Sequence, residues 1–434
     1  MNAKFSFLSL LLIVLFSTQI SLANESAAVL ARKAVSEDPA EATAAIDELR
    51  ALGPQGLEAL MTQYAAEIDI RIADPKVGAS PEWIRITKAL DLVGQQKNNF
   101  ISGLYWYTDL EDAKRAARES GKPILSLRLL GNLTDELSCA NSRFFRTVLY
   151  PNAQVRDVLL NRFVLHWKSV RPAPRITVDF GDGRKLERTV TGNSIHYILD
   201  SNGRLIEALP GLYGPVAFKR ELEDAEKLLS TLARKNDRER NLLLRNYYTE
   251  RIKQNSLAWE ADTKQFGANV PSRIRISPNM NTDGLSISDL AITKSATERP
   301  LVRSITSVTV ELGPIADESA WKRIARLHQS DWLLDERSTS LIKRQNPQLS
   351  QKDMLRMINK FQESVGVDTV RNEYLMRPTL YSWLMRDNLR ADLETFNTSV
   401  YANLFFTPSS DQWLGLLPSD VYVAVDHGGT LNPQ

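Results

Sequence analysis

The sequence contains only one cysteine, Cys139, and only four histidines among 434 residues. One thiol cannot form a disulfide within the chain, so any disulfide would need a second molecule. With so few histidines and a single cysteine, no cluster with metal-ligand spacing is present, and we expect no metal site. Walker loops, dinucleotide-binding glycine motifs and EF-hand loops are also missing from the sequence, so no cofactor is expected.

The chain also lacks an excess of charge of either sign. Lysine and arginine total 54, aspartate and glutamate total 52, and the formal net charge is +2. Nucleic-acid-binding domains usually carry a clustered basic face. The arginine-rich stretch 235–245 instead alternates in sign, which is typical of a solvated helix face. We therefore expect no nucleic-acid partner.

Long apolar runs are confined to the first residues of the sequence. Lys4 gives a basic start, residues 5–16 are almost entirely apolar, and Ser21 and Ala23 supply the small residues that signal peptidase accepts. The run is short for a transmembrane helix, although an uncleaved anchor is the alternative. The sequence predicts a signal peptide over 1–23, cleaved near Ala23. The mature chain is then exported to the periplasm or secreted, with no transmembrane segment.

Residues 104–234 show alternating helix and strand patterns. An amphipathic helix over 110–119 ends at a Ser-Gly stop, and the apolar run 123–130 has the length of a buried strand. The patterns downstream predict a helix over 153–161, a strand over 163–169, a hairpin insertion over 178–186, paired strands over 194–200 and 204–208, and a closing helix over 216–232. This order implies an α/β sandwich with a mixed sheet.

Cys139 falls where a helix begins, because apolar residues recur at helical spacing over 144–149. Unpaired N–H groups and the positive end of the helix dipole favour a thiolate there. The Ser142 hydroxyl could donate to that thiolate, and Arg143 lies on the same helix. A catalytic thiol served by Ser142 and Arg143 could form a mixed disulfide or a sulfenic acid. The competing interpretation is an inert cysteine buried under the loop.

This unit resembles the thioredoxin-like superfamily, in particular its exported branch. The resemblance rests on Asp112-Ala-Lys-Arg-Ala-Ala-Arg-Glu-Ser-Gly-Lys-Pro-Ile-Leu125, on Cys139 with Ser142, on Asn161-Arg-Phe-Val-Leu165 and on Ile198-Leu-Asp-Ser-Asn-Gly-Arg204. It implies a thioredoxin-like sandwich for residues 104–234.

Two departures from the family pattern bear on function. The family's Cys-x-x-Cys is Cys139-Ala-Asn-Ser142 here, and no proline stands at Asn193 or Ser194, where the family's cis-proline would fall. The resemblance therefore implies a thioredoxin fold without dithiol redox activity. The first hypothesis is a binding or assembly module of the cell envelope with a protein or peptide partner. The alternative is a monothiol oxidoreductase or peroxide-reactive thiol protein that uses Cys139.

The remaining sequence reads as mostly helical. Residues 24–103 form a helical N-terminal domain, in which one helix pair resembles a HEAT-type unit. Residues 235–434 form a mixed, mostly helical C-terminal domain that resembles no characterised family. The expected elements are helices over 27–35, 39–52, 56–66, 239–260, 319–334 and 387–405, a helix starting at Ser350, and a strand over 301–312.

Two further groups of residues could carry chemistry. His166 and His196 lie in predicted strands that could bring them together as a metal or acid–base pair, with ordinary polar strand residues as the alternative. Lys168 and Arg171 end a strand and, with Arg143, could form an anion pocket. Exposed basic residues are the alternative there. His328 lies on a tryptophan-rich helix and is expected to pack.

Overall fold

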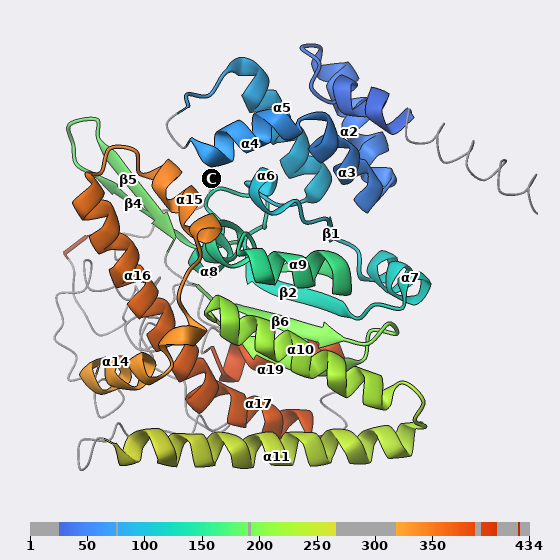
Figure 1. Ribbon diagram of the computed structural model, residues 1–434, viewed down its shortest axis with the longest axis vertical. Coiled ribbons are helices and arrows are strands. Elements are labelled where there is room, and N and C mark those ends of the chain that lie inside the picture. The colour runs from blue at the N-terminus through green and yellow to red at the C-terminus, as the bar shows by residue number, and fades with distance from the viewer. Residues whose placement is uncertain are drawn as a thin grey trace, which may run out of the picture.

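The computed structural model describes residues 26–74, 77–189, 192–265, 318–386, 392–405 and 424–425. Within these ranges a helical N-terminal layer, an α/β sandwich and a mostly helical C-terminal region lie against one another (Figure 1). The expected mixed α/β class is therefore confirmed. The expected signal peptide and the strand over 301–312 lie outside the described residues.

A five-stranded sheet forms the centre of the molecule, in the order β1-β3-β2-β6-β7. Strands β1 and β2 pair in parallel with β3, whereas β6 is antiparallel to both β2 and β7, which confirms the mixed sheet. Every residue of the central strand β2 is buried, which explains its almost unbroken apolar sequence. The strands are β1 (Trp106–Tyr107), β2 (Ile124–Leu130), β3 (Val164–Arg171), β6 (Ser194–Leu199) and β7 (Leu205–Pro210).

Helices cover both faces of this sheet. Successive strand residues point to opposite faces. His196 of β6 contacts the rings of Phe145 and Phe218, whereas its neighbour Tyr197 contacts Phe396. In Figure 1, α9 and α10 accordingly lie in front of the sheet and α19 lies behind it. The covering helices are α7 (Leu110–Ser120), α8 (Ala140–Phe144), the π-helix η1 (Phe145–Leu149), α9 (Ala153–Arg162), α10 (Pro215–Leu232) and α19 (Leu393–Asn403).

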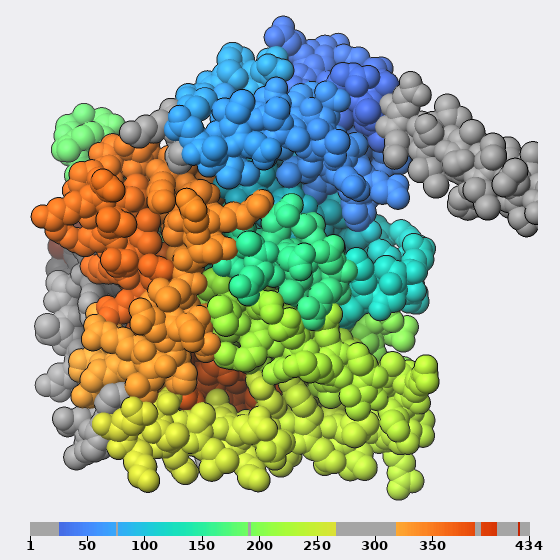
Figure 2. All heavy atoms as spheres, in the orientation of Figure 1, coloured from blue at the N-terminus to red at the C-terminus, as the bar shows by residue number. Residues whose placement is uncertain are grey.

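The N-terminal helices pack on one edge of the sandwich around a second buried cluster, to which Leu341 of the C-terminal region also belongs. Figure 2 shows this blue layer above the sandwich, with the yellow helix α11 along the opposite side. Arg50 joins the layer to the sheet by donating to the backbone oxygen of Trp106 in β1 at 2.5 Å, and it also donates to the backbone oxygen of Val93 within the layer at 2.9 Å. The helices are α2 (Pro39–Ala51), α3 (Pro54–Gln63), α4 (Ala65–Ala73), α5 (Pro81–Gly94) and α6 (Asn99–Ser102). The helix expected over 56–66 is divided at Tyr64.

The C-terminal region shares the core of the sandwich. Val365, Leu380 and Phe396 belong to the same buried cluster as the β2 leucines. The long helix expected as a polar connector buries Leu244 and Tyr248 against this core. The elements are α11 (Asp237–Lys264), α14 (Glu318–Leu327), the 3-10 turn η4 (Gln329–Asp331), α15 (Glu336–Gln345), α16 (Gln351–Arg371), the π-helix η5 (Asn372–Met376) and α17 (Arg377–Leu384).

Two helix boundaries in this region test the sequence signals. Ser350 caps α16 as expected, because its hydroxyl accepts from the backbone N–H of Asp353 at 3.1 Å. The helix expected over 319–334 ends instead at Leu327, and η4 follows it. None of the described helices combines the length and apolarity needed to span a membrane.

The connection from β3 to β6 carries the expected hairpin insertion. Its strands are β4 (Arg175–Asp179) and β5 (Lys185–Thr189), which pair antiparallel. Gly183 in the turn has a φ of +91°, a conformation that side-chain-bearing residues rarely adopt. The hairpin projects from the sandwich at the upper left of Figure 1.

Candidate functional site

Cys139 lies at the start of α8, the first helix after the central strand β2. Its backbone N–H donates to Leu130 at 3.1 Å, and its Sγ accepts from the N–H of Ser142 at 3.4 Å. The expected placement of the thiol at a helix start is therefore confirmed. The α-helical part is short, because the π-helix η1 takes over at Phe145.

The three predicted site residues are neighbours, but their side chains are not directed at one another. Cys139 and Ser142 have no exposed surface. The Ser142 hydroxyl lies 2.7 Å from Ser138 Oγ and 2.8 Å from the Cys139 carbonyl, so it donates to oxygen and not to the thiol. Arg143 donates to Thr189 Oγ1 of the hairpin at 2.8 Å. The expected serine–thiolate bond is therefore wrong.

Two C-terminal helices contact segments of the sandwich near this thiol in the fold. Phe361 of α16 contacts the ring of Phe144 with 5.7 Å between centroids. On the other side, the Tyr401 hydroxyl of α19 donates to the backbone oxygen of Asn193 at 3.2 Å. The backbone oxygen of Asn193 is therefore already bound within the chain.

The two strand histidines do not form a pair. Strands β3 and β6 flank β2, and His166 is in register with Ser126 whereas His196 is in register with Leu127. Adjacent residues of β2 face opposite ways, so the imidazoles lie on opposite faces of the sheet. Burial lowers the pKa of each to about 3, with a further contribution from Arg128 at His166. Both are neutral strand residues, and a paired site is wrong.

The prediction of an anion pocket is also wrong, because Lys168 and Arg143 bind different groups of the chain. Lys168 binds Glu394 of α19 at 3.2 Å, while Arg143 binds Thr189 on the hairpin. The same Glu394 carboxylate binds Arg128, a fully buried residue of β2, at 3.0 Å. Glu394 therefore already neutralises the positive charges of Arg128 and Lys168.

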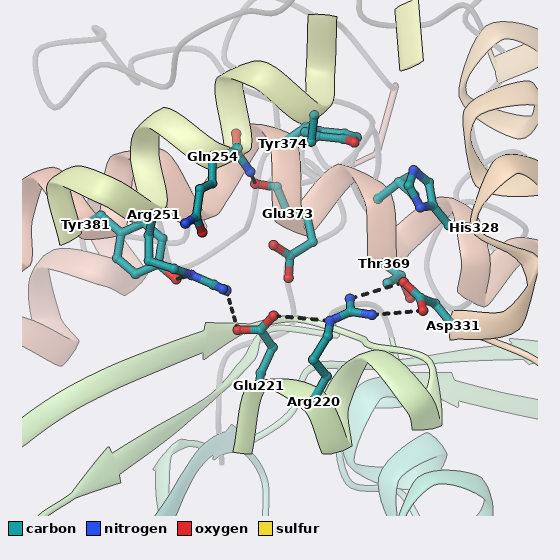
Figure 3. A pocket seen from close by; sticks show the side chains of 13 residues that line it. Arg220, Glu221, Arg251, Gln254, His328, Asp331, Thr369, Glu373, Tyr374 and Tyr381 are labelled. Atoms are coloured by element: carbon teal, nitrogen blue, oxygen red, sulfur yellow. Dashed lines mark hydrogen bonds and ion pairs between the residues drawn. The ribbon is translucent and has the colours of Figure 1, made fainter. Parts of the chain in front are cut away.

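A second site, which we call the charged pocket, lies between α10, α11, the turn η4 and the α16–η5–α17 segment. Its cavity has a volume of about 210 Å³, and Figure 3 shows charged side chains entering it from all of these elements. Its charged lining residues are Arg220, Glu221, Arg251, His328, Asp331 and Glu373. Arg220 and His328 are partly exposed at the rim, whereas Glu221 forms the buried floor.

The floor of the charged pocket is organised around Arg377, which solvent does not reach. Its Nη1 lies 2.6 Å from Glu221 and 3.1 Å from Glu373, and its Nη2 lies 3.2 Å from Glu207. Arg251 binds the same Glu221 oxygen at 2.5 Å. The Nε of Arg220 also lies 3.8 Å from the other oxygen of Glu221. Glu221 is therefore paired with three guanidinium groups, whereas Glu373 is paired with one.

This difference separates the protonation of the two carboxyl groups. Burial raises the pKa of Glu373, and the negative charge of Glu221 adds to this effect against the attraction of Arg377. Burial acts in the same direction on Glu221, but Arg377 and Arg251 outweigh it and lower the pKa of Glu221. Neighbouring carboxyl groups with pKa values shifted in opposite directions are typical of functional sites.

The rim of the charged pocket carries two further charge pairs. Both terminal nitrogens of Arg220 bind Asp331, at 2.9 and 3.1 Å. His328, expected only to pack, lies 2.6 Å from Asp262, and this hydrogen bond raises the pKa of His328. Tyr374 donates to the same Asp262 oxygen at 2.5 Å.

Sequence patterns could not assemble the charged pocket, because its residues come from distant segments of the chain. One local signal was present: Glu373 and Arg377 are four residues apart and pair along one helix face. Glu373 and Tyr374 also belong to the π-helix η5, and single-turn π-helices often mark functional sites.

No family model, curated protein or solved structure matches this chain. Its function is therefore inferred from the geometry of its own sites.

Proposed function

We propose that the protein is a binding or assembly module of the cell envelope, built on a thioredoxin-like sandwich and lacking dithiol redox activity. The thioredoxin-like assignment is supported by the strand order β1-β3-β2-β6-β7, by a thiol at the first helix turn after β2, and by helices on both faces. The loss of redox activity is supported by Ser142 at the position of the second thiol.

The observation that carries this proposal is the burial of Cys139. Disulfide exchange requires the attacking sulfur to reach the sulfur of its substrate. Cys139 has no exposed surface, and Tyr401 occupies the neighbouring backbone oxygen of Asn193. A protein substrate could reach the thiol only after the groups that bury it moved away. A structural cysteine within a closed sandwich explains this arrangement.

One observation favours the alternative of a monothiol oxidoreductase or peroxide-reactive thiol. The backbone N–H of Ser142 donates to Cys139 Sγ, which stabilises a thiolate. Hydrogen peroxide is small enough to enter through brief local openings. Attack of the thiolate on peroxide would break the O–O bond and give a sulfenic acid and hydroxide, which takes up a proton from solvent to form water. A second thiol would then be needed for reduction.

Export is part of the same proposal. It is supported by the basic start at Lys4, the apolar stretch 5–16 and the small residues before position 24. A periplasmic or secreted protein with a single cysteine has no internal disulfide, so its fold depends on its core. The expected partner is a protein or peptide.

A peroxide and mixed-disulfide assay tests the proposal. The mature chain and its Cys139→Ser variant are incubated with hydrogen peroxide and, separately, with oxidised glutathione at pH 7. We expect peroxide to be consumed equally by both proteins, and no glutathione adduct on the native chain. Consumption or adduct formation that Cys139→Ser abolishes would support the monothiol alternative.

A further inference from the structure

We propose that the charged pocket binds an organic cation, namely a primary ammonium or guanidinium group on a free amine or on a lysine or arginine side chain of a peptide. The inference deepens the proposed binding role and rests on it, but it does not depend on Cys139. Four structural elements of the sandwich and the C-terminal region form the pocket, and the argument starts from which of their charges are already neutralised.

The arginines of the charged pocket are all bound to carboxylates. Arg220 binds Asp331 through both terminal nitrogens, and Arg251 binds Glu221. Arg377 lies among three glutamates and is fully buried. An anionic ligand would have to displace one of these carboxylates, so the charged pocket is a poor site for phosphate or carboxylate ligands.

The carboxyl groups, in contrast, have capacity left. The Glu373 carboxyl points into the cavity in Figure 3, and the ion pair that holds it joins a single oxygen, Oε1, to Arg377. Among the lining residues, the carboxyl groups of Glu221, Asp331 and Glu373 face the basic groups of Arg220, Arg251 and His328. The pairs immediately behind the lining add Glu207 beside Arg377 and Asp262 beside His328. With these pairs included, five carboxyl groups face three arginines and one histidine, so the charge that this pocket lacks is positive.

The walls of the cavity fit an organic cation better than a metal ion. Tyr374 and Tyr381 line it, and aromatic rings attract ammonium and guanidinium groups. In the described part of the chain, no three histidine, cysteine, aspartate or glutamate side chains are grouped so that they could hold a metal ion. A cavity of about 210 Å³ accepts a side-chain-sized group. The exposed residues Gln254 and Ala258 mark its entrance.

Binding should be coupled to proton release from Glu373. The groups that face this carboxyl are Arg220 and Glu221 from α10, Arg251 from α11, Arg377 from α17, and His328 with Asp331 from the turn at η4. A bound cation favours the ionised carboxylate, whose pKa is raised in the free protein. His328 is also less positive at higher pH. Both effects make cation affinity increase as the pH rises.

Titration calorimetry of the mature chain tests the inference. The probes are agmatine, n-butylamine and acetyl-lysine amide, with n-butanol and sodium acetate as neutral and anionic controls. We expect the cations to bind at least tenfold more tightly than either control, with affinity rising between pH 5 and pH 8. Tighter binding of acetyl-lysine amide than of n-butylamine would identify a peptide side chain as the source of the cation, and the reverse order a free amine.

Two variants separate the charged pocket from a general effect of protein charge. Glu373→Gln removes the carboxyl group that points into the cavity, and Ala258→Phe narrows the entrance from an exposed position without changing a charge. Each should weaken cation binding at least tenfold, whereas Glu119→Gln, an exposed substitution on α7, should leave it unchanged. Urea unfolding of each variant checks that it folds.

The outcomes distinguish this inference from the proposed function. Equal binding of n-butanol and n-butylamine, preferential binding of acetate, or no cation binding in the millimolar range would overturn the ligand class even if Cys139 stays unreactive. Retained cation binding in both pocket variants would overturn the site. Cation binding together with a reactive Cys139 would overturn only the absence of thiol chemistry.

Discussion

The guanidinium of Arg377 lies 2.6 Å from the carboxylate of Glu221, and solvent reaches neither group appreciably. Arg377 begins α17 and Glu221 lies on α10, so this ion pair joins the C-terminal region to the sandwich. A buried ion pair is weak evidence for net stability, because desolvation offsets much of the attraction. Removal of one partner, however, leaves an unpaired buried charge.

Replacement of Arg377 by methionine should destabilise the protein strongly. Glu221, Glu207 and Glu373 would lose their shared counter-charge, and breaking a buried pair in this way typically costs about 3–5 kcal/mol. Urea unfolding at pH 7 measures the change. At lower pH the loss of unfolding free energy should be smaller, because the unpaired carboxyl groups can take up protons.

Arg115→Ala is the matched control for this prediction. Arg115 binds Asp112 at 2.6 Å on the exposed surface of α7, and exposed pairs contribute at most about 1 kcal/mol. If Arg377→Met lowered the free energy of unfolding no more than Arg115→Ala does, the proposed role of Arg377 in holding the buried glutamates would be contradicted.

Gly214→Ala tests the contact between α10 and the η4 turn. A Cβ at Gly214 would lie 2.3 Å from the backbone oxygen of Asp331 and 2.3 Å from the Cα of Trp332. Backbone atoms cannot move aside as a flexible side chain can, so we expect a loss of about 1–3 kcal/mol in the free energy of unfolding. Gly78→Ala is the control, because nothing lies within 4 Å of its added Cβ. Equal unfolding midpoints for the two variants would argue against this packing.

The pH dependence of stability should report the buried histidines. Burial lowers the pKa of His196 from 6.5 to about 3, so between these values the unfolded chain binds the extra proton. Stability is therefore lost as the pH falls below about 6.5, by up to about 1.4 kcal/mol per pH unit for one group. The contribution of His328 to this pH dependence has the opposite sign, because the hydrogen bond to Asp262 raises the pKa of His328.

His196→Gln should flatten this dependence. It removes one titrating group but can still bind the Tyr150 hydroxyl, which lies 2.8 Å from Nε2 of His196. Urea unfolding at half-unit steps from pH 4 to pH 7 gives the slope. A variant slope as steep as that of the wild type would show that His196 can be protonated without loss of the fold.

Processing of the N-terminus provides an independent prediction. The full sequence, expressed in a bacterial host with intact export, should yield a mature protein that begins at Asn24. Intact-mass measurement of the extracytoplasmic fraction gives the first residue. Replacement of Ala23 by a bulky residue such as phenylalanine should block cleavage by signal peptidase. A full-length mass in the soluble cytoplasmic fraction would contradict export.

The sandwich was largely predictable from sequence, because its signals are local. The helix over 153–161 and the strand over 123–130 agree with α9 and β2 to within a residue. The apolar period sets such elements, and capping residues such as Asn152, which accepts from Gln154 and Val155, fix their ends.

The charged pocket was not predictable, because charged residues in helices usually face solvent. Glu221 lies on the amphipathic helix α10, whereas Arg377 begins α17, most of whose residues are buried. Only tertiary packing brings the two charges together. The π-helix η5, which places Glu373 in the cavity, also has no clear sequence signature. Strand neighbours likewise depend on topology, and the insertion of β2 between β3 and β6 separates the two histidines.

The burial of Cys139 is tested most directly by the rate of its alkylation. Iodoacetamide labelling of the mature chain at pH 7, followed by mass, is compared with labelling in unfolding concentrations of urea. A cysteine placed at the exposed Ser120 in a Cys139→Ala chain serves as the accessible control. We predict that native Cys139 reacts at least a hundredfold more slowly than this control and at the ordinary rate once the chain is unfolded. Labelling of native Cys139 as fast as the control would contradict the closed site.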